Sequence, residues 1–137
     1  MNKIFSFVMV GSNDFKKSSK FYDAIFVPLK LKKTVTTERY IGYGQSNEPN
    51  EVKFYITKPR NGEPATFGNG TMVAFLAETR EAVNKFHEIA IENGADDEGS
   101  PGIREDGNYY AYVRDCDGNK ITAKCISNKM KKIKGEM

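Results

Sequence analysis

The 137-residue sequence lacks tryptophan and contains only one histidine and two cysteines. A single histidine, His87, excludes any site built from two imidazoles. Two cysteines are too few for a disulfide framework. Cys116 and Cys125 fall at opposite ends of an expected strand, roughly 25 Å apart at the rise of a β-strand, so we expect two free thiols. Asp115 and Asp117 flank Cys116 and should raise its pKa.

Long apolar runs are also missing, since none approaches the roughly 20 residues of a membrane span. The apolar N-terminal run at 4–10 is short and leads into a helix-capping pattern rather than a cleavage site, which favours a strand over a signal peptide. We therefore expect a cytosolic protein with no membrane partner.

The net charge of +3 is concentrated at the C-terminus. Residues 128–137 contain four lysines and one glutamate, which account for the whole excess and leave the rest of the chain neutral. Because no aromatic residues are interleaved with these lysines, we expect a solvated tail and no nucleic-acid partner.

The sequence repeats one pattern at an offset of 65 residues. VMVGSNDFKKSSKFYD (8–23) and VAFLAETREAVNKFHE (73–88) each consist of an apolar run, a polar cap and an amphipathic stretch. Val8 then corresponds to Val73, and Phe21 to Phe86. A repeat of this length predicts two halves of similar fold.

Each half is predicted to fold as β-α-β-β-β, which gives an α+β protein. The expected strands cover residues 4–10, 29–36, 39–44, 52–57, 71–76, 96–104, 109–114 and 120–126. The first helix should begin after the capping side chains of Ser12, Asn13 and Asp14 and end before Pro28. The second should begin after Thr79, end at Gly94 and bury Val83, Phe86, Ala90 and Ile91. The predicted parts are a first unit at 1–57, a Pro/Gly-rich linker at 58–70, a second unit at 71–127 and the basic tail at 128–137.

Strand alternation predicts which side chains lie under the helices. In the first strand of each half, Val8 and Val73 should be covered, whereas Phe7 and Met72 should lie on the open face. On the last strand, Ile121, Ala123 and Cys125 should be covered, whereas Lys120, Thr122 and Lys124 should face the other side. An apolar open face usually encloses a ligand or meets a partner.

Several segments resemble the vicinal oxygen chelate superfamily, which includes glyoxalase I, bleomycin-resistance proteins and extradiol dioxygenases. The segments are FSFVMVGSNDFKKSSKFYDAIFVPLKL (5–31), GNGTMVAF (68–75), KFHEIAIENGADDEGSPGIR (85–104) and NYYAYVRDCDGNKI (108–121). The resemblance covers residues 4–126 and is greatest to the bacterial glyoxalase-like group. It implies tandem βαβββ units whose mixed sheets curl around a shared cavity, with the helices outside.

The metal ligands of that family usually lie on the first strand of each unit and on the last strand. The resemblance places these positions at Phe7, Met72 and Thr122, where the family has two histidines and a glutamate. A phenyl ring has no donor atom, a thioether is a poor ligand for Zn²⁺, Mn²⁺ or Fe²⁺, and a neutral hydroxyl replaces a carboxylate poorly. The resemblance therefore implies neither metal nor cofactor, and places glyoxalase I and dioxygenase activities in doubt.

These observations favour a metal-independent protein that binds an apolar or aromatic small molecule. The candidate ligand-binding residues are Phe7, Met72, Tyr110, Tyr112, Thr122 and Lys124, and no catalytic residue is identified. Each also has a purely structural interpretation, as sheet packing, an edge tyrosine or a solvated lysine. Arg104, Glu105 and Asp106 fall on a loop that would border the cavity, and His87 is expected at the helix surface.

Two other functions stay open. The chain would be a glyoxalase-like lyase or isomerase if its polar groups included an acid–base pair, although the sequence identifies none. It would be a dimerisation or regulatory module if the open sheet face were a protein interface. We expect a homodimer, and the sequence does not choose between units paired within one chain and units exchanged between two.

Overall fold

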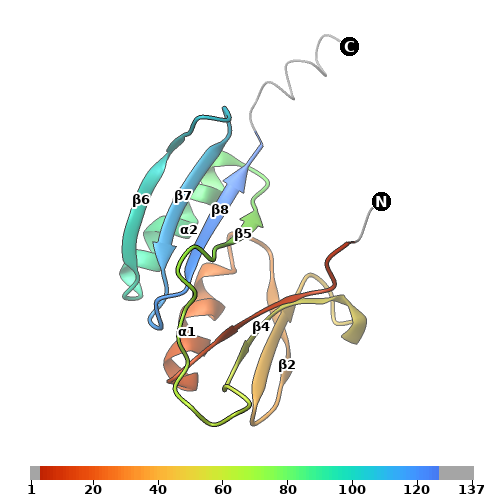
Figure 1. Cartoon of the computed structure of the whole chain (residues 1–137). Coiled ribbons are helices and arrows are strands. Elements are labelled where there is room, and N and C mark those ends of the chain that lie inside the picture. The colour runs from red at the N-terminus through yellow and green to blue at the C-terminus, as the bar shows by residue number, and fades with distance from the viewer. Residues whose placement is uncertain (1–3, 127–137) are drawn as a thin grey trace.

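The structure is a computed structural model that describes residues 4–126, so the predicted basic tail at 128–137 lies outside the described residues. The first unit contains β1 (Val8–Gly11), α1 (Phe15–Ile25), β2 (Lys32–Thr36), β3 (Tyr40–Gly44) and β4 (Val52–Thr57). The second contains β5 (Val73–Leu76), α2 (Arg80–Glu92), β6 (Asp96–Ile103), β7 (Tyr109–Arg114) and β8 (Lys120–Cys125) (Figure 1). The predicted α+β fold with tandem βαβββ units is confirmed. No described helix has the length and apolar character to cross a membrane.

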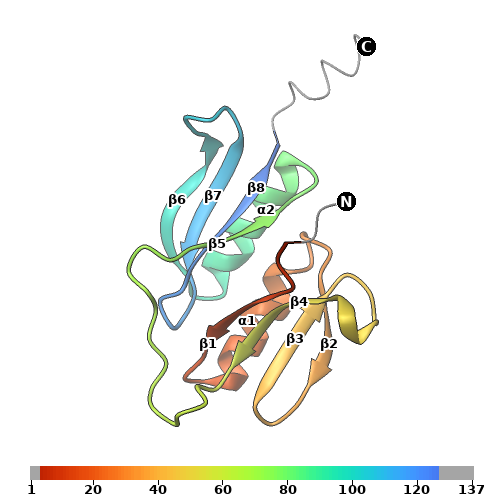
Figure 2. The ribbon, with the colours of Figure 1, turned by 45° about the vertical axis from the view of Figure 1, so that its right-hand side comes forward.

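The two units form separate four-stranded sheets with the same strand order. The first runs β1-β4-β3-β2 and the second β5-β8-β7-β6. In each sheet the first strand pairs in parallel with the last, and the other pairs are antiparallel. Figure 2 shows the two sheets beside one another, with α1 and α2 behind them. Within residues 4–126, the two sheets are not joined into one closed sheet.

The 65-residue offset of the repeat is preserved in the strands, although both strands are shorter than predicted. β1 begins at Val8 and β5 at Val73, where their parallel ladders with Phe54 and Ile121 begin. The predicted starts at residues 4 and 71 are therefore wrong, because the preceding residues lie outside the hydrogen-bonded ladders.

Both helices begin where side-chain caps predict. Asp14 accepts a hydrogen bond from the backbone N–H of Lys17 at 3.1 Å, and Thr79 accepts one from Ala82 at 3.0 Å. α1 ends at Ile25, before Pro28, as expected. Beyond the last turn of α2, Gly94 has a φ of +96°, a left-handed conformation that favours glycine.

The core-facing side of α2 differs from the prediction at one residue. Val83, Phe86 and Ala90 are fully buried as expected, but Ile91 is 39% exposed. Ile89 packs against the core instead. The stripe of α2 that meets the core runs through Ala82, Phe86 and Ile89 at spacings of four and three residues, and Ile91 lies beyond its other edge.

Phe75 joins the cores of the two units. It belongs to β5, and its ring lies 5.1 Å from Phe26 and 5.3 Å from Phe54, both in the first unit. Aromatic pairs such as these two stabilise a protein beyond the effect of the apolar area that they bury.

The predicted covered faces of the strands are confirmed, since Ile121 and Ala123 are fully buried and Val73 packs against the core.

A buried carboxylate, Asp115, connects the β7–β8 turn to α1. Its Oδ2 accepts a hydrogen bond from the Tyr22 hydroxyl at 2.6 Å, and its Oδ1 accepts bonds from the backbone N–H groups of Asp117 and Asn119 at 2.9 Å. The Asn119 side chain donates both to Asp115 at 3.0 Å and to the Gly11 carbonyl at 3.2 Å. Burial raises the pKa of Asp115, and burial together with Asp115 raises the pKa of Tyr22.

The same turn makes a second set of contacts with the start of α1. The Ser18 hydroxyl donates to Asp117 at 3.1 Å and lies 2.6 Å from that of Ser12. The backbone N–H of Asn13 also donates to Asp117 at 2.9 Å. Cys116 is a free thiol, as is Cys125, and burial followed by the neighbouring carboxylates raises the pKa of Cys116. Both cysteine predictions are confirmed.

Replacing Tyr22 with phenylalanine should lower the free energy of unfolding by about 1–3 kcal/mol, because the buried Asp115 carboxylate loses a donor. Tyr40→Phe is the matched control, since the Tyr40 hydroxyl donates no hydrogen bond to any residue in the described range. Urea unfolding of both variants measures the difference. Equal losses for the two would contradict the role assigned to the Tyr22–Asp115 bond.

Candidate functional site

Two tyrosines form an aromatic wall on the open face of the second sheet. Tyr110 and Tyr112 alternate along β7 with buried Ala111 and Val113, so they share the face away from the core. Their rings are nearly parallel, at 6°, with centroids 5.6 Å apart. Both tyrosine rings therefore lie on the open face of the second sheet.

Cationic side chains lie over both rings. Lys120 Nζ is 5.4 Å from the centroid of Tyr112, and Lys124 Nζ is 5.6 Å from that of Tyr110. The guanidinium carbon of Arg104 is also 5.4 Å from Tyr112. Cations at this distance are attracted to the ring faces, which restrains three flexible side chains.

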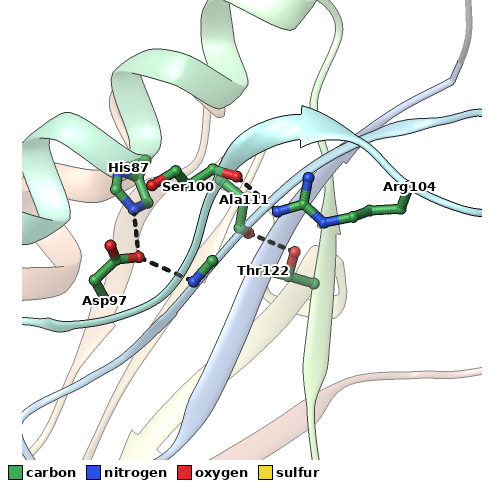
Figure 3. Close-up of polar contacts among 7 residues, drawn as sticks. His87, Asp97, Ser100, Arg104, Ala111 and Thr122 are labelled. Carbon is green, nitrogen blue, oxygen red and sulfur yellow. Dashed lines mark hydrogen bonds and ion pairs between the residues drawn. The ribbon is translucent and has the colours of Figure 1, made fainter.

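Thr122 lies on β8 beside this wall but has no exposed surface. Its hydroxyl donates to the Ala111 carbonyl at 2.6 Å (Figure 3). A second, longer contact of 3.3 Å joins it to the carbonyl of Ala123. Thr122 is therefore uncharged, and its hydroxyl group already donates its hydrogen bond within the protein.

Phe7 and Met72 occupy equivalent positions, each one residue before the first strand of its unit. Their exposed fractions are similar, 49% and 44%. Phe7 packs edge-on against Tyr55 of β4 at 4.9 Å, and Tyr55 packs against Tyr40 of β3 at 5.4 Å. The open face of the first sheet thus carries an aromatic row, of which Tyr40 and Tyr55 were not among the predicted site residues.

The structure divides the predicted ligand-binding residues between two separate grooves. A groove of about 600 Å³ lies between β1 and β5 and contains Phe7. Its lining is mostly apolar: Phe5, Ser6, Phe7, Val8, Leu29, Leu31, Gln45, Lys53, Phe54, Val73, Ala74, Phe75, Leu76, Ala77, Glu78, Cys125 and Ile126. A second, shallower groove of about 660 Å³ contains Tyr110 and Tyr112 together with Arg104, Glu105 and Asp106. These three loop residues lie beside an open groove on the second sheet, and not beside a cavity shared by the two units.

The donor atoms at the three metal positions do not suit a divalent cation. Phe7 offers none, Met72 offers a thioether, and the hydroxyl of Thr122 is buried and donates to a backbone carbonyl. Within residues 4–126, no group of three or more His, Cys, Asp or Glu side chains is placed to hold a metal ion.

The sequence profile of the Glyoxalase/Bleomycin resistance protein/Dioxygenase superfamily matches residues 4–122, nearly all of the described chain. The chain belongs to this superfamily. Among proteins with curated descriptions, none matches it. The superfamily assignment agrees with the tandem βαβββ units and confirms the resemblance seen in the sequence.

Solved structures of the superfamily resemble the chain over nearly its full length. A glyoxalase/bleomycin resistance protein from Albidiferax ferrireducens T118 is 44% identical, with a TM-score of 0.81, over 90% of this chain and 98% of that one. The fosfomycin resistance protein FosX from Mesorhizobium loti is 14% identical, with a TM-score of 0.65, over 96% and 98%. Lactoylglutathione lyase from Agrobacterium tumefaciens is 15% identical, with a TM-score of 0.62, over 91% and 95%. The last two likenesses show the fold alone.

His87, the only histidine of this superfamily member, lies outside the open faces. Its Nε2 is 3.0 Å from Asp97 Oδ1, which also accepts a bond from the backbone N–H of Gly99 at 2.9 Å (Figure 3). These two bonds, the one from His87 being the larger effect, hold the pKa of Asp97 below its ordinary value. His87 therefore ties α2 to β6, as a residue at the helix surface.

The Asp97 contacts predict a specific loss of stability in acid. A carboxyl whose pKa is lowered by folding stabilises the protein above its ordinary pKa and loses that contribution as the pH falls through the lowered value. Asp97→Asn should therefore flatten the acid side of a plot of Tm against pH. Asp96→Asn, a change of the same charge at the adjacent exposed residue, should leave the slope unchanged. Parallel acid slopes for wild type and Asp97→Asn would contradict the assignment.

Proposed function

We propose that this protein is a metal-independent, small-molecule-binding member of the superfamily. One observation carries the proposal: the family's metal positions correspond to Phe7, Met72 and Thr122, none of which presents a usable donor. The 65-residue offset between β1 and β5 supports the equivalence of Phe7 and Met72 independently of the resemblance.

The surroundings of these positions favour an apolar or aromatic ligand. Phe7 continues into the aromatic row with Tyr55 and Tyr40, and the β1–β5 groove beside it is lined mainly by apolar side chains. Ligand pockets are typically of this size and composition, with a few polar groups that set orientation. On the second sheet, Tyr110, Tyr112 and Lys124 supply such groups. The buried Thr122 lies opposite Tyr112 on β8, and Met72 directly precedes β5, the strand beyond β8.

The polar pair on this face favours binding over proton transfer. The Tyr110 hydroxyl donates to Asp106, which raises the pKa of Tyr110 and lowers that of Asp106. A general acid or base works best when its pKa lies near the working pH, and both shifts move these groups away from neutrality. The pair therefore gives no support to the alternative of a lyase or isomerase.

Protein purified without a tag should contain Zn, Ni, Mn and Fe only far below one atom per chain. Its Tm should be the same with and without a chelator, because no folded-state metal contributes to stability. Elemental analysis and thermal unfolding measure these two quantities. One equivalent of any of these metals, with loss of stability on its removal, would contradict metal independence.

We also propose that the protein forms a homodimer through β1 and β5. Each of these strands pairs on only one side, so each leaves a row of backbone donors and acceptors at an open edge. Large exposed apolar side chains accompany these edges: Ile4, Phe5, Phe7, Met9, Met72, Leu76 and Ile126. A second copy of the chain has complementary edges and apolar faces, and covering them would remove apolar surface from water and enclose a ligand.

Leu76→Glu should weaken the dimer, since Leu76 on β5 is 69% exposed and a charge there would have to be desolvated in the interface. Ile103→Glu is the control, because Ile103 is also exposed but lies on β6 at the opposite edge of the same sheet. Sedimentation equilibrium over a concentration series measures both dissociation constants. A monomeric wild type, or equal weakening by the two variants, would contradict this interface.

A further inference from the structure

The open face of the second sheet carries four cationic side chains, and its carboxylates, Glu98, Glu105 and Asp106, form ion pairs with only two of them. Arg114 and Lys120 share Glu98, at 3.3 and 3.8 Å. Arg104 and Lys124 form no ion pair with any carboxylate in residues 4–126, although Lys124 helps to lower the pKa of Asp106. Two cations that are held over tyrosine rings therefore remain available to an anion from solution.

Arg104 is held in place by one hydrogen bond and by two glycines. Its Nη2 donates to the Ser100 carbonyl at 2.6 Å, as Figure 3 shows. A Cβ on Gly102 would lie 2.8 Å from Nη1, and one on Gly99 would lie 3.2 Å from Nη2, so the guanidinium packs directly against the backbone of two glycines. The Ser100 carbonyl is the only hydrogen-bond acceptor of the Arg104 guanidinium among the described residues, which leaves most of its five N–H donors free.

The tyrosine wall beside Arg104 offers flat apolar surface and one free hydroxyl. The hydroxyl of Tyr110 is engaged with Asp106, whereas that of Tyr112 makes no hydrogen bond within the described part of the chain. The groove that these residues line, about 660 Å³, is large enough for a small organic molecule. Thr122 next to it adds neither charge nor a free donor.

We propose that this face binds an aromatic carboxylate, with the carboxylate at Arg104 and Lys124 and the ring against Tyr110 and Tyr112. A neutral aromatic ligand would cover the cations without replacing their water, which costs free energy. A small inorganic anion would leave the tyrosine surface unused. An aromatic carboxylate satisfies both features. The inference rests on the proposed function and narrows its ligand from apolar or aromatic to anionic and aromatic.

The test compares 2-naphthoate with 2-naphthamide, which have nearly the same size and shape but differ in charge. In isothermal titration calorimetry at low salt, the full-length protein should bind naphthoate about tenfold more tightly, the value of one charge-assisted hydrogen bond. The preference should shrink as salt is raised, since the cations are partly exposed. Equal affinity for the two probes, or binding of neither, would overturn the inference.

Substitutions of the two cationic residues test which side chains cause the preference for naphthoate over naphthamide. Arg104→Gln and Lys124→Gln should each remove most of it, whereas Arg60→Gln, the same loss of charge on the exposed linker, should leave it intact. Circular dichroism verifies that each variant is folded. Because Arg104 follows β6 and Lys124 lies on β8, a folding failure of one variant leaves the other to test the inference. An unchanged preference in both would place the carboxylate elsewhere and overturn the assignment.

Different experimental results would contradict this inference and the proposed function. Equal binding of naphthoate and naphthamide would remove the carboxylate specificity and leave metal-independent ligand binding standing. One equivalent of bound metal would contradict metal independence, while the ratio of the two affinities would still report on Arg104 and Lys124.

Discussion

The arrangement of the chain depends on one buried carboxylate, Asp115. Its oxygens accept bonds from the backbone of its own turn and from Tyr22 in the other unit, so the same carboxylate closes the β7–β8 turn and joins it to α1. A buried acid without donors would be strongly destabilising, and burial does raise its pKa. The hydrogen bond between Tyr22 and Asp115 therefore positions the β7–β8 turn and α1 relative to each other.

The candidate ligand face is built on the two strands that this turn joins. Tyr110 and Tyr112 lie on β7, and Lys120 and Lys124 lie on β8, so the turn sets the register that stacks the rings beneath the cations. On the other side of these strands, Phe75 extends the core into the first unit. The hydrogen-bonded turn and the aromatic packing of Phe75 thus hold the two units together at two separate contacts. The open faces of the sheets and the edges of β1 and β5 remain uncovered.

Local patterns in the sequence predicted what depends on near neighbours. The caps at Asp14 and Thr79, the stop at Gly94 and the alternation along β8 all act within a few residues, and all are confirmed. The predictions were wrong or incomplete where the structure depends on contacts between residues far apart in the chain. The strand starts depend on where β4 and β8 begin to pair, and Arg104 was placed only on a loop because its position depends on the gap that two glycines leave in β6.

The sequence by itself determined the two-unit fold and the equivalence of Phe7 and Met72, because a repeat fixes equivalent positions, and it determined that neither side chain is a suitable donor for a divalent cation. Only the tertiary structure decided which groups meet. It separated Phe7 from the tyrosine wall, buried the hydroxyl of Thr122 against Ala111 and brought Arg104 back over β6. Hydrogen bonds and packing between segments far apart in the chain set those distances, and no local pattern encodes them.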